Sequence, residues 1–126
     1  MRKFISLAVV FVLVILGVWF IRNRGADEIP SGSGTPETNA VIYTDQGYSP
    51  ATLTVKAGTS VIFKNQSTGQ MWTASAVHPT HTILPEFDPK TGTPPQASYS
   101  FTFLKAGTWK YHNHLKPNHG GTVIVE

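Results

Sequence analysis

The chain ends in Gly107-Thr-Trp-Lys-Tyr-His-Asn-His-Leu-Lys-Pro-Asn-His-Gly-Gly-Thr-Val-Ile-Val-Glu126, where aromatic and polar residues alternate before an aliphatic run. Trp109 and Tyr111 recur with the two-residue period of a β-strand, so they share one face of that strand. Two aromatic rings on one face predict that this face is buried, and Asn113 points inward with them. The stretch therefore predicts a strand packed on a core.

This stretch contains three of the five histidines, and these three fall within eight consecutive residues: His112, His114 and His119. His112 and His114 are two residues apart, so on a strand both imidazoles lie on the face opposite the aromatic rings. Two imidazoles on one strand face can chelate a single metal ion. Pro117-Asn-His-Gly-Gly121 predicts a turn, and Thr122-Val-Ile-Val125 predicts the closing strand.

Short strands separated by turn signals precede this stretch. The predicted strands cover Val41–Tyr43, Thr52–Val55, Ser60–Lys64 and Ala97–Leu104. No segment after residue 39 has the apolar period of a helix. Strands at this spacing predict an all-β protein, an antiparallel sandwich or barrel, and residues 40–126 suffice for one small core of this kind.

A long irregular segment from Asn65 to Gln96 separates two of these strands. It contains Trp72, the motif His78-Pro-Thr-His81 and several prolines. Loops of this length in small domains are commonly functional or disordered, and the aromatic and aliphatic content argues against disorder. We expect the segment to fold over one end of the sandwich.

The amino-terminal part is of a different kind. Phe4 to Ile21 is an almost unbroken apolar run of 18 residues with basic residues on both sides, close to the ~20 residues that span a bilayer. We predict a transmembrane signal anchor (a helix) over residues 1–22, a flexible linker over residues 23–39 and one domain over residues 40–126. A cleaved signal peptide, which would make the protein secreted, is the alternative.

The composition excludes several classes of site. The chain contains no cysteine, so it has no disulfide, thiolate ligand or cysteine nucleophile. Its net charge of +3 owes much to the basic residues beside the apolar run, and the absence of a later basic cluster argues against nucleic-acid binding. No Ser/His/Asp set, phosphate-binding loop or acid/base pair supports hydrolysis, so a non-enzymatic role is favoured.

Four pieces of the domain occur in an order typical of one family. They are Gly47-Tyr-Ser-Pro50, Leu53-Thr-Val-Lys-Ala-Gly-Thr-Ser-Val-Ile-Phe-Lys-Asn65, Phe101-Thr-Phe-Leu-Lys-Ala-Gly-Thr-Trp-Lys-Tyr111 and Gly121-Thr-Val-Ile-Val125. Through them the chain from Val41 to Glu126 resembles the cupredoxin family of plastocyanin- and azurin-like copper proteins. The resemblance implies a two-sheet Greek-key β-sandwich that carries copper at one end.

The copper ligands of that family are all changed in this chain. A blue-copper site uses His, Cys, His and a weak axial Met. The resemblance places these ligands, in that order, at Met71, Asn113, Lys116 and His119. Without a thiolate there is no blue copper centre, so ordinary blue-copper electron transfer is not expected.

Histidines stand near these changed positions. Tyr111-His-Asn-His-Leu115 is similar to the Tyr-His-Ser-His-Leu stretch of multicopper oxidases, in which both histidines hold copper at a cluster shared between domains. His78-Pro-Thr-His81 resembles a histidine-rich loop of Cys-less cupredoxin-like proteins. A single domain would have to oligomerise to form a full oxidase cluster.

These observations predict a histidine-rich, non-blue metal site. The candidate ligands, in order of preference, are His112, His114, His81, His78 and His119. An all-imidazole site favours Cu(II), with Zn(II) next and Ni(II) after it. The carboxylates of Glu86 and Asp88 could act as ligands, orient an imidazole, or only solvate the loop.

Three functions are compatible with such a site. The first is a membrane-tethered, extracytoplasmic (periplasmic or cell-surface) copper-binding protein for copper buffering, delivery or resistance. Its partners would be the metal ion, the membrane, and a copper-transfer protein or a second copy of the chain. The second is a redox, electron-transfer or oxidase-like copper protein. The third is a cupredoxin-fold interaction module without metal.

Overall fold

The computed structural model describes residues 39–126. Its strands are β1 (Ala40–Thr44), β2 (Gly47–Ser49), β3 (Thr52–Val55), β4 (Thr59–Asn65), β5 (Thr73–Ser75), β6 (Ser98–Phe103), β7 (Gly107–Asn113) and β8 (Lys116–Val125). Within this part of the chain no helix is long and apolar enough to cross a membrane. The predicted anchor over residues 1–22 and the predicted linker over residues 23–39, apart from its last residue, lie outside the described residues.

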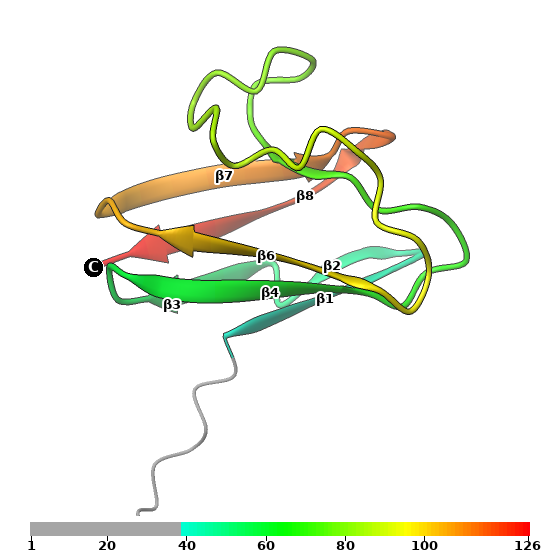
Figure 1. Cartoon of the computed structure of the whole chain (residues 1–126), viewed down its shortest axis with the longest axis horizontal. Helices are drawn as coiled ribbons and strands as arrows, with labels where there is room; N and C mark the ends of the chain where they lie inside the picture. Colours follow the sequence, from blue (N-terminus) through cyan, green and yellow to red (C-terminus); the bar gives the residue numbers. More distant parts are fainter. Residues whose placement is uncertain (1–38) are drawn as a thin grey trace, which may run out of the picture. The chain divides into compact units, whose positions relative to one another are not determined.

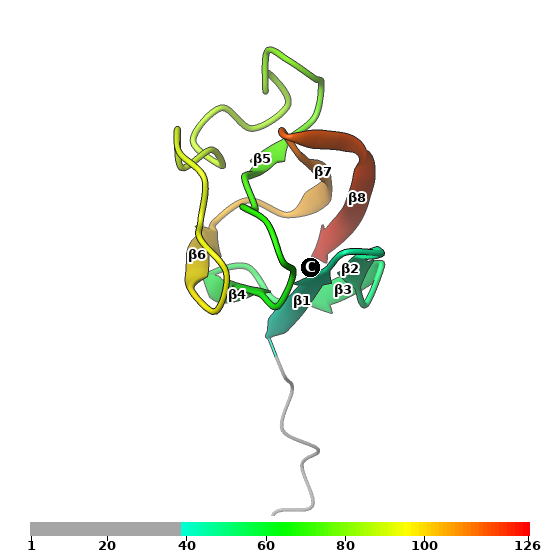
Figure 2. The same ribbon diagram turned by 90° about the vertical axis from the view of Figure 1, so that its right-hand side faces the viewer.

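Two four-stranded sheets face each other (Figures 1 and 2). One sheet has the strand order β2-β1-β4-β6 and the other the order β3-β8-β7-β5. Alternate residues of β1 and β4 are buried, among them Val41, Tyr43 and Phe63, because one face of each strand packs on the core. The predicted all-β sandwich of two sheets is confirmed, and residues 39–126 contain no helix.

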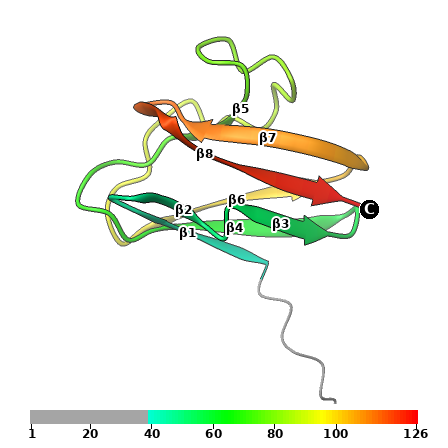
Figure 3. The ribbon, with the colours of Figure 1, turned by 180° about the vertical axis from the view of Figure 1, so that it is seen from behind.

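The predicted antiparallel arrangement is wrong for two of the strand pairs. β1 pairs with β4 in parallel, and β3 pairs with β8 in parallel. After β1 and β2 the chain crosses to the other sheet to form β3 and then returns as β4, and parallel neighbours require such a crossover. The carboxyl end of the chain thus comes to lie beside β3, where Val55 is paired with Val125 (Figure 3).

The hairpin that carries three histidines also differs from the prediction. Pro117–Gly121 is not a turn but part of β8, and the turn consists of His114 and Leu115. β7 and β8 pair regularly until His112 faces Gly120, and then the register shifts so that Asn113 pairs with Lys116. The register skips residues 117–119, and Pro and Gly, which indicate a turn in the sequence, are also found at such bulges.

The segment from residue 65 to residue 96 contains a strand that the alternation of apolar and polar residues does not predict. All three residues of β5, Thr73–Ser75, are buried, and the strand pairs with β7. A strand buried on both faces has no polar alternation to mark it. Residues 76–97 then form the loop that leads to β6 and lies beside β5 and β7 (Figures 1 and 2).

One residue of this β5–β6 loop belongs to the core. Phe87 is fully buried. The centroid of its ring lies 5.4 Å from that of Phe63, 4.9 Å from that of Phe101 and 6.0 Å from that of Tyr111. These partners come from β4, β6 and β7, so Phe87 packs between the two sheets and anchors the loop.

We expect Phe87→Ala to lower the free energy of unfolding by about 3 to 5 kcal/mol, because it leaves a cavity among aromatic rings. Denaturant unfolding of the metal-free protein measures this loss. Leu104→Ala is the control, since that side chain is 76% exposed and its removal should change stability little. Equal losses in the two variants would contradict the anchoring role of Phe87.

Candidate metal centre

The first pair of histidines comes from the β7–β8 hairpin. His112 follows the core residue Tyr111 in β7, so its side chain lies on the outer face of the sheet. It is nevertheless only 6% exposed, because histidines of the β5–β6 loop lie against it. His114 lies one residue beyond β7, where its backbone N–H donates to the Trp72 carbonyl oxygen at 2.7 Å.

The second pair comes from the β5–β6 loop. The backbone N–H of His81 donates to the Val77 carbonyl oxygen at 2.7 Å, and Ser75 Oγ donates to the His81 carbonyl oxygen at 3.0 Å. His81 has a φ of 52°, in the left-handed region that side chains with a Cβ rarely adopt. These contacts hold His81 in a buried position, whereas His78 is exposed.

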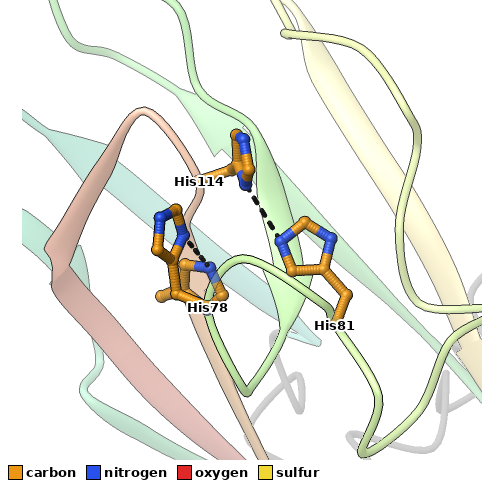
Figure 4. A group of neighbouring side chains, drawn as sticks. His78, His81 and His114 are labelled. Carbon is orange, nitrogen blue, oxygen red and sulfur yellow. Dashed lines mark hydrogen bonds between the residues drawn. The ribbon is translucent and has the colours of Figure 1, made fainter.

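The four imidazoles converge and form what we call the four-histidine group (Figure 4). His78 Nδ1 lies 3.3 Å from His112 Nε2, and His81 Nε2 lies 3.0 Å from His114 Nδ1. One nitrogen of each residue lies within 4.8 Å of the other three. At metal–nitrogen distances of about 2.0–2.1 Å, two ligands of one ion are about 2.9 Å apart at a 90° angle and about 3.4 Å apart at the tetrahedral angle that zinc prefers. The donor atoms and the two short spacings fit a single copper or zinc ion.

The fifth histidine lies elsewhere in the domain. His119 Nδ1 is 3.1 Å from Tyr43 Oη, and His119 is not a member of the four-histidine group. The other three positions to which the resemblance assigns copper ligands also lie outside the four-histidine group. Met71 is fully buried, Lys116 is exposed, and Asn113 Nδ2 donates to Tyr43 Oη at 2.8 Å.

A buried carboxylate supports His81. Asp88 Oδ2 lies 2.6 Å from His81 Nδ1, and the Asp88 side chain is only 3% exposed. Burial alone would raise the pKa of Asp88, but hydrogen bonds, that from His81 first, outweigh burial and hold this pKa well below its usual range. The sequence could not distinguish Asp88 from Glu86, the exposed carboxylate of the same loop, because their separation depends on the path of the loop.

Trp72 is a neighbour of the group that the sequence analysis did not identify. Its ring centroid lies 4.5 Å from that of His114, with 36° between the ring planes. Its Nε1 donates to Asp88 Oδ1 at 2.8 Å. Neither contact follows from residue spacing, and the only signal in the sequence is the place of Trp72 in the long segment.

Burial also favours the neutral form of the imidazoles. It lowers the pKa of His112 to about 4, and repulsion from the other three histidines of the group acts in the same direction. Burial likewise lowers the pKa of His114, with His81 and His78 adding to the effect. The neutral imidazole is the form that binds a metal ion, so the group is prepared for a cation.

The depressed pKa of His112 predicts a loss of stability in acid. The unfolded chain takes up the proton near pH ~6.5, whereas the folded, metal-free protein does so only near pH 4. As the pH falls through this window the unfolded state binds more protons, so the free energy of unfolding should fall by about 3 kcal/mol. Above the window His112 contributes no pH dependence.

Denaturant unfolding at several pH values measures this effect. His112→Gln, which does not titrate, should show a smaller slope of stability against pH between ~6.5 and ~4. An unchanged slope in this variant, or an NMR titration of His112 at the ordinary imidazole pKa, would contradict the burial of a neutral ring.

Comparisons with known proteins agree with this fold. Residues 10–125 match the family described as cupredoxin-like domain. A solved structure of a purple cupredoxin from Nitrosopumilus maritimus is similar with a TM-score of 0.61 and 21% identity, over 69% of this chain and 98% of that chain. A mutant of amicyanin in the Cu(I) state is similar with a TM-score of 0.59 and 28% identity, over 69% and 80% of the two chains. No match was found among curated proteins.

Proposed function

We propose that this chain, which belongs to the family of cupredoxin-like domains, binds one copper ion through the four-histidine group. The group consists of His78, His81, His112 and His114. The observation that carries the proposal is the convergence of four imidazole nitrogens within 4.8 Å of one another. The similarity to amicyanin, which holds Cu(I) in the structure above, favours copper over other ions that imidazoles bind.

The donor atoms favour the oxidised ion. All four are imidazole nitrogens, whereas soft thiolate and thioether ligands select Cu(I). The chain has no cysteine, and the four-histidine group contains no methionine. Since Cu(II) also stands above Zn(II) in the order of affinities, we infer a Cu(II) site for which zinc competes.

The proposed role is copper handling at a membrane. The apolar run from Phe4 to Ile21 supports an anchor over residues 1–22, and residues 23–39 would tether the domain outside the cytoplasm. Histidine ligands without thiolate suit an oxidising compartment. His78 is exposed, so the ion could exchange with a partner protein or a second copy, as buffering, delivery or resistance to copper requires.

Titration of the metal-free full chain in detergent with Cu(II) tests the proposal. We expect a 1:1 complex whose electron paramagnetic resonance spectrum shows nitrogen coupling and whose optical spectrum lacks the intense band of a copper–thiolate bond. The double variant His112→Ala/His114→Ala should lose this coupling and bind more than about a hundredfold more weakly, because half of the donors are removed.

His119→Ala is the matched control, since it removes the same side chain from the same hairpin outside the group. It should bind Cu(II) as the wild type does. If the wild type binds Cu(II) no more tightly than free histidine does, the copper site is refuted and the metal-free interaction module becomes the better interpretation. Loss of binding in His119→Ala alone would refute the choice of ligands.

A redox role is the second candidate, and the exposure of His78 favours it because small reactants could reach an ion held at this edge of the group. Cycles of reduction by ascorbate and oxidation by peroxide test it. Copper that changes oxidation state and stays bound through many cycles would support a redox protein. Copper that leaves on reduction would support handling.

A further inference from the structure

One carboxylate is connected to two members of the four-histidine group. Asp88 Oδ2 accepts hydrogen bonds from His81 Nδ1 at 2.6 Å and from Lys90 Nζ at 2.9 Å. Asp88 Oδ1 accepts from Trp72 Nε1 at 2.8 Å and from the Lys90 backbone N–H at 2.9 Å. The Trp72 ring in turn lies against that of His114. The Asp88 side chain is 3% exposed, whereas its two bonds to Lys90 lie at the surface, where the Lys90 side chain is 75% exposed.

The donors around Asp88 determine which nitrogen of His81 carries the proton. An indole N–H, a backbone N–H and an ammonium group only donate, and a carboxylate only accepts. His81 Nδ1 must therefore hold the proton that it shares with Asp88. In a neutral imidazole this leaves the lone pair on Nε2, which is the atom that faces His114 Nδ1 at 3.0 Å.

We propose that Asp88 is a positioning residue of the metal centre. It holds His81 in the tautomer whose Nε2 is free to bind an ion, and it holds the Trp72 ring against His114. A carboxylate bonded to a ligating imidazole fixes the orientation of the ring and increases its basicity. The inference rests on the proposed function for the bound ion, whereas the tautomer of His81 is a property of the metal-free protein.

Asp88→Asn isolates this role because it keeps the size of the side chain and replaces one acceptor by a donor. The amide oxygen should stay with Trp72 Nε1 and the Lys90 backbone N–H, since neither of these donors can accept a hydrogen bond. His81 Nδ1 then faces the amide NH₂ group and must accept. This moves the His81 proton to Nε2, the atom that would bind the ion.

The experiment reads the tautomer and the affinity separately. Imidazole ¹⁵N NMR of the metal-free full chain, at about pH 8 and so above the ordinary imidazole pKa, should show the His81 proton on Nδ1 in the wild type and on Nε2 in Asp88→Asn. Titration with Cu(II) should show about 10–100-fold weaker binding in Asp88→Asn. Asp88→Glu keeps a carboxylate and should recover part of the affinity.

Glu86→Gln is the matched control. It removes the same charge two residues away, from a side chain that is 55% exposed and lies 3.9 Å from Lys105. Because Glu86 is bonded to no histidine, this variant should keep the wild-type tautomer and the wild-type affinity. An equal loss of affinity in Glu86→Gln would show that net charge of the loop, not positioning by Asp88, sets the affinity, and would overturn the proposal.

Two further results would overturn the proposal: a His81 proton on Nε2 in the wild type, or a wild-type tautomer with wild-type affinity in Asp88→Asn. If Asp88→Asn does not fold, the wild-type tautomer and the affinity of Asp88→Glu decide. If the tautomer switches as expected while the wild type binds no copper, the positioning of His81 is supported and the proposed copper function fails.

Discussion

The hydrogen bonds of the buried Asn113 side chain fix the positions of His112 and His114. Its Oδ1 accepts from the backbone N–H groups of Trp72 at 3.0 Å and Leu115 at 3.1 Å, and its Nδ2 donates to Tyr43 Oη at 2.8 Å. Asn113 and Tyr43 are fully buried, so either of them left without the bond between them would cost about 1–3 kcal/mol. These bonds join β1, the chain before β5 and the turn after β7, and so they fix the two histidines that flank Asn113.

A second constraint acts on the β5–β6 loop, and it couples the core to the candidate site. Phe87 lies among aromatic rings of both sheets, and the next residue, Asp88, is bonded to His81 and Trp72. Burial of one apolar ring thus sets the position of the carboxylate beside it. A loop held by the core in this way can present side chains with the precision of a regular element, which a metal centre requires.

None of the four positions at which the family resemblance places copper ligands belongs to the four-histidine group. The resemblance places Asn113 where the family has a thiolate, and in the structure the Asn113 amide joins the two sheets. His112 instead lies on the face of β7 opposite Tyr111, and His78 and His81 of the β5–β6 loop lie against it. Any ion held there would have nitrogen ligands only, so its chemistry would lack the copper–sulfur bond that defines a blue centre.

Alternating burial in β1 and β4, the turn signals and the pair His112 and His114 are local properties, so the sandwich and half of the candidate site could be predicted from residue order. His78 and His81 are candidate ligands in the sequence, but only the folded loop brings them to His112 and His114. The exclusion of His119, the parallel strand pairs and the bonds of Asp88 could not be predicted, because they depend on how strands pair and how the loop closes over them. A two-residue period reports only which face of a strand is buried and carries no information about what will cover it.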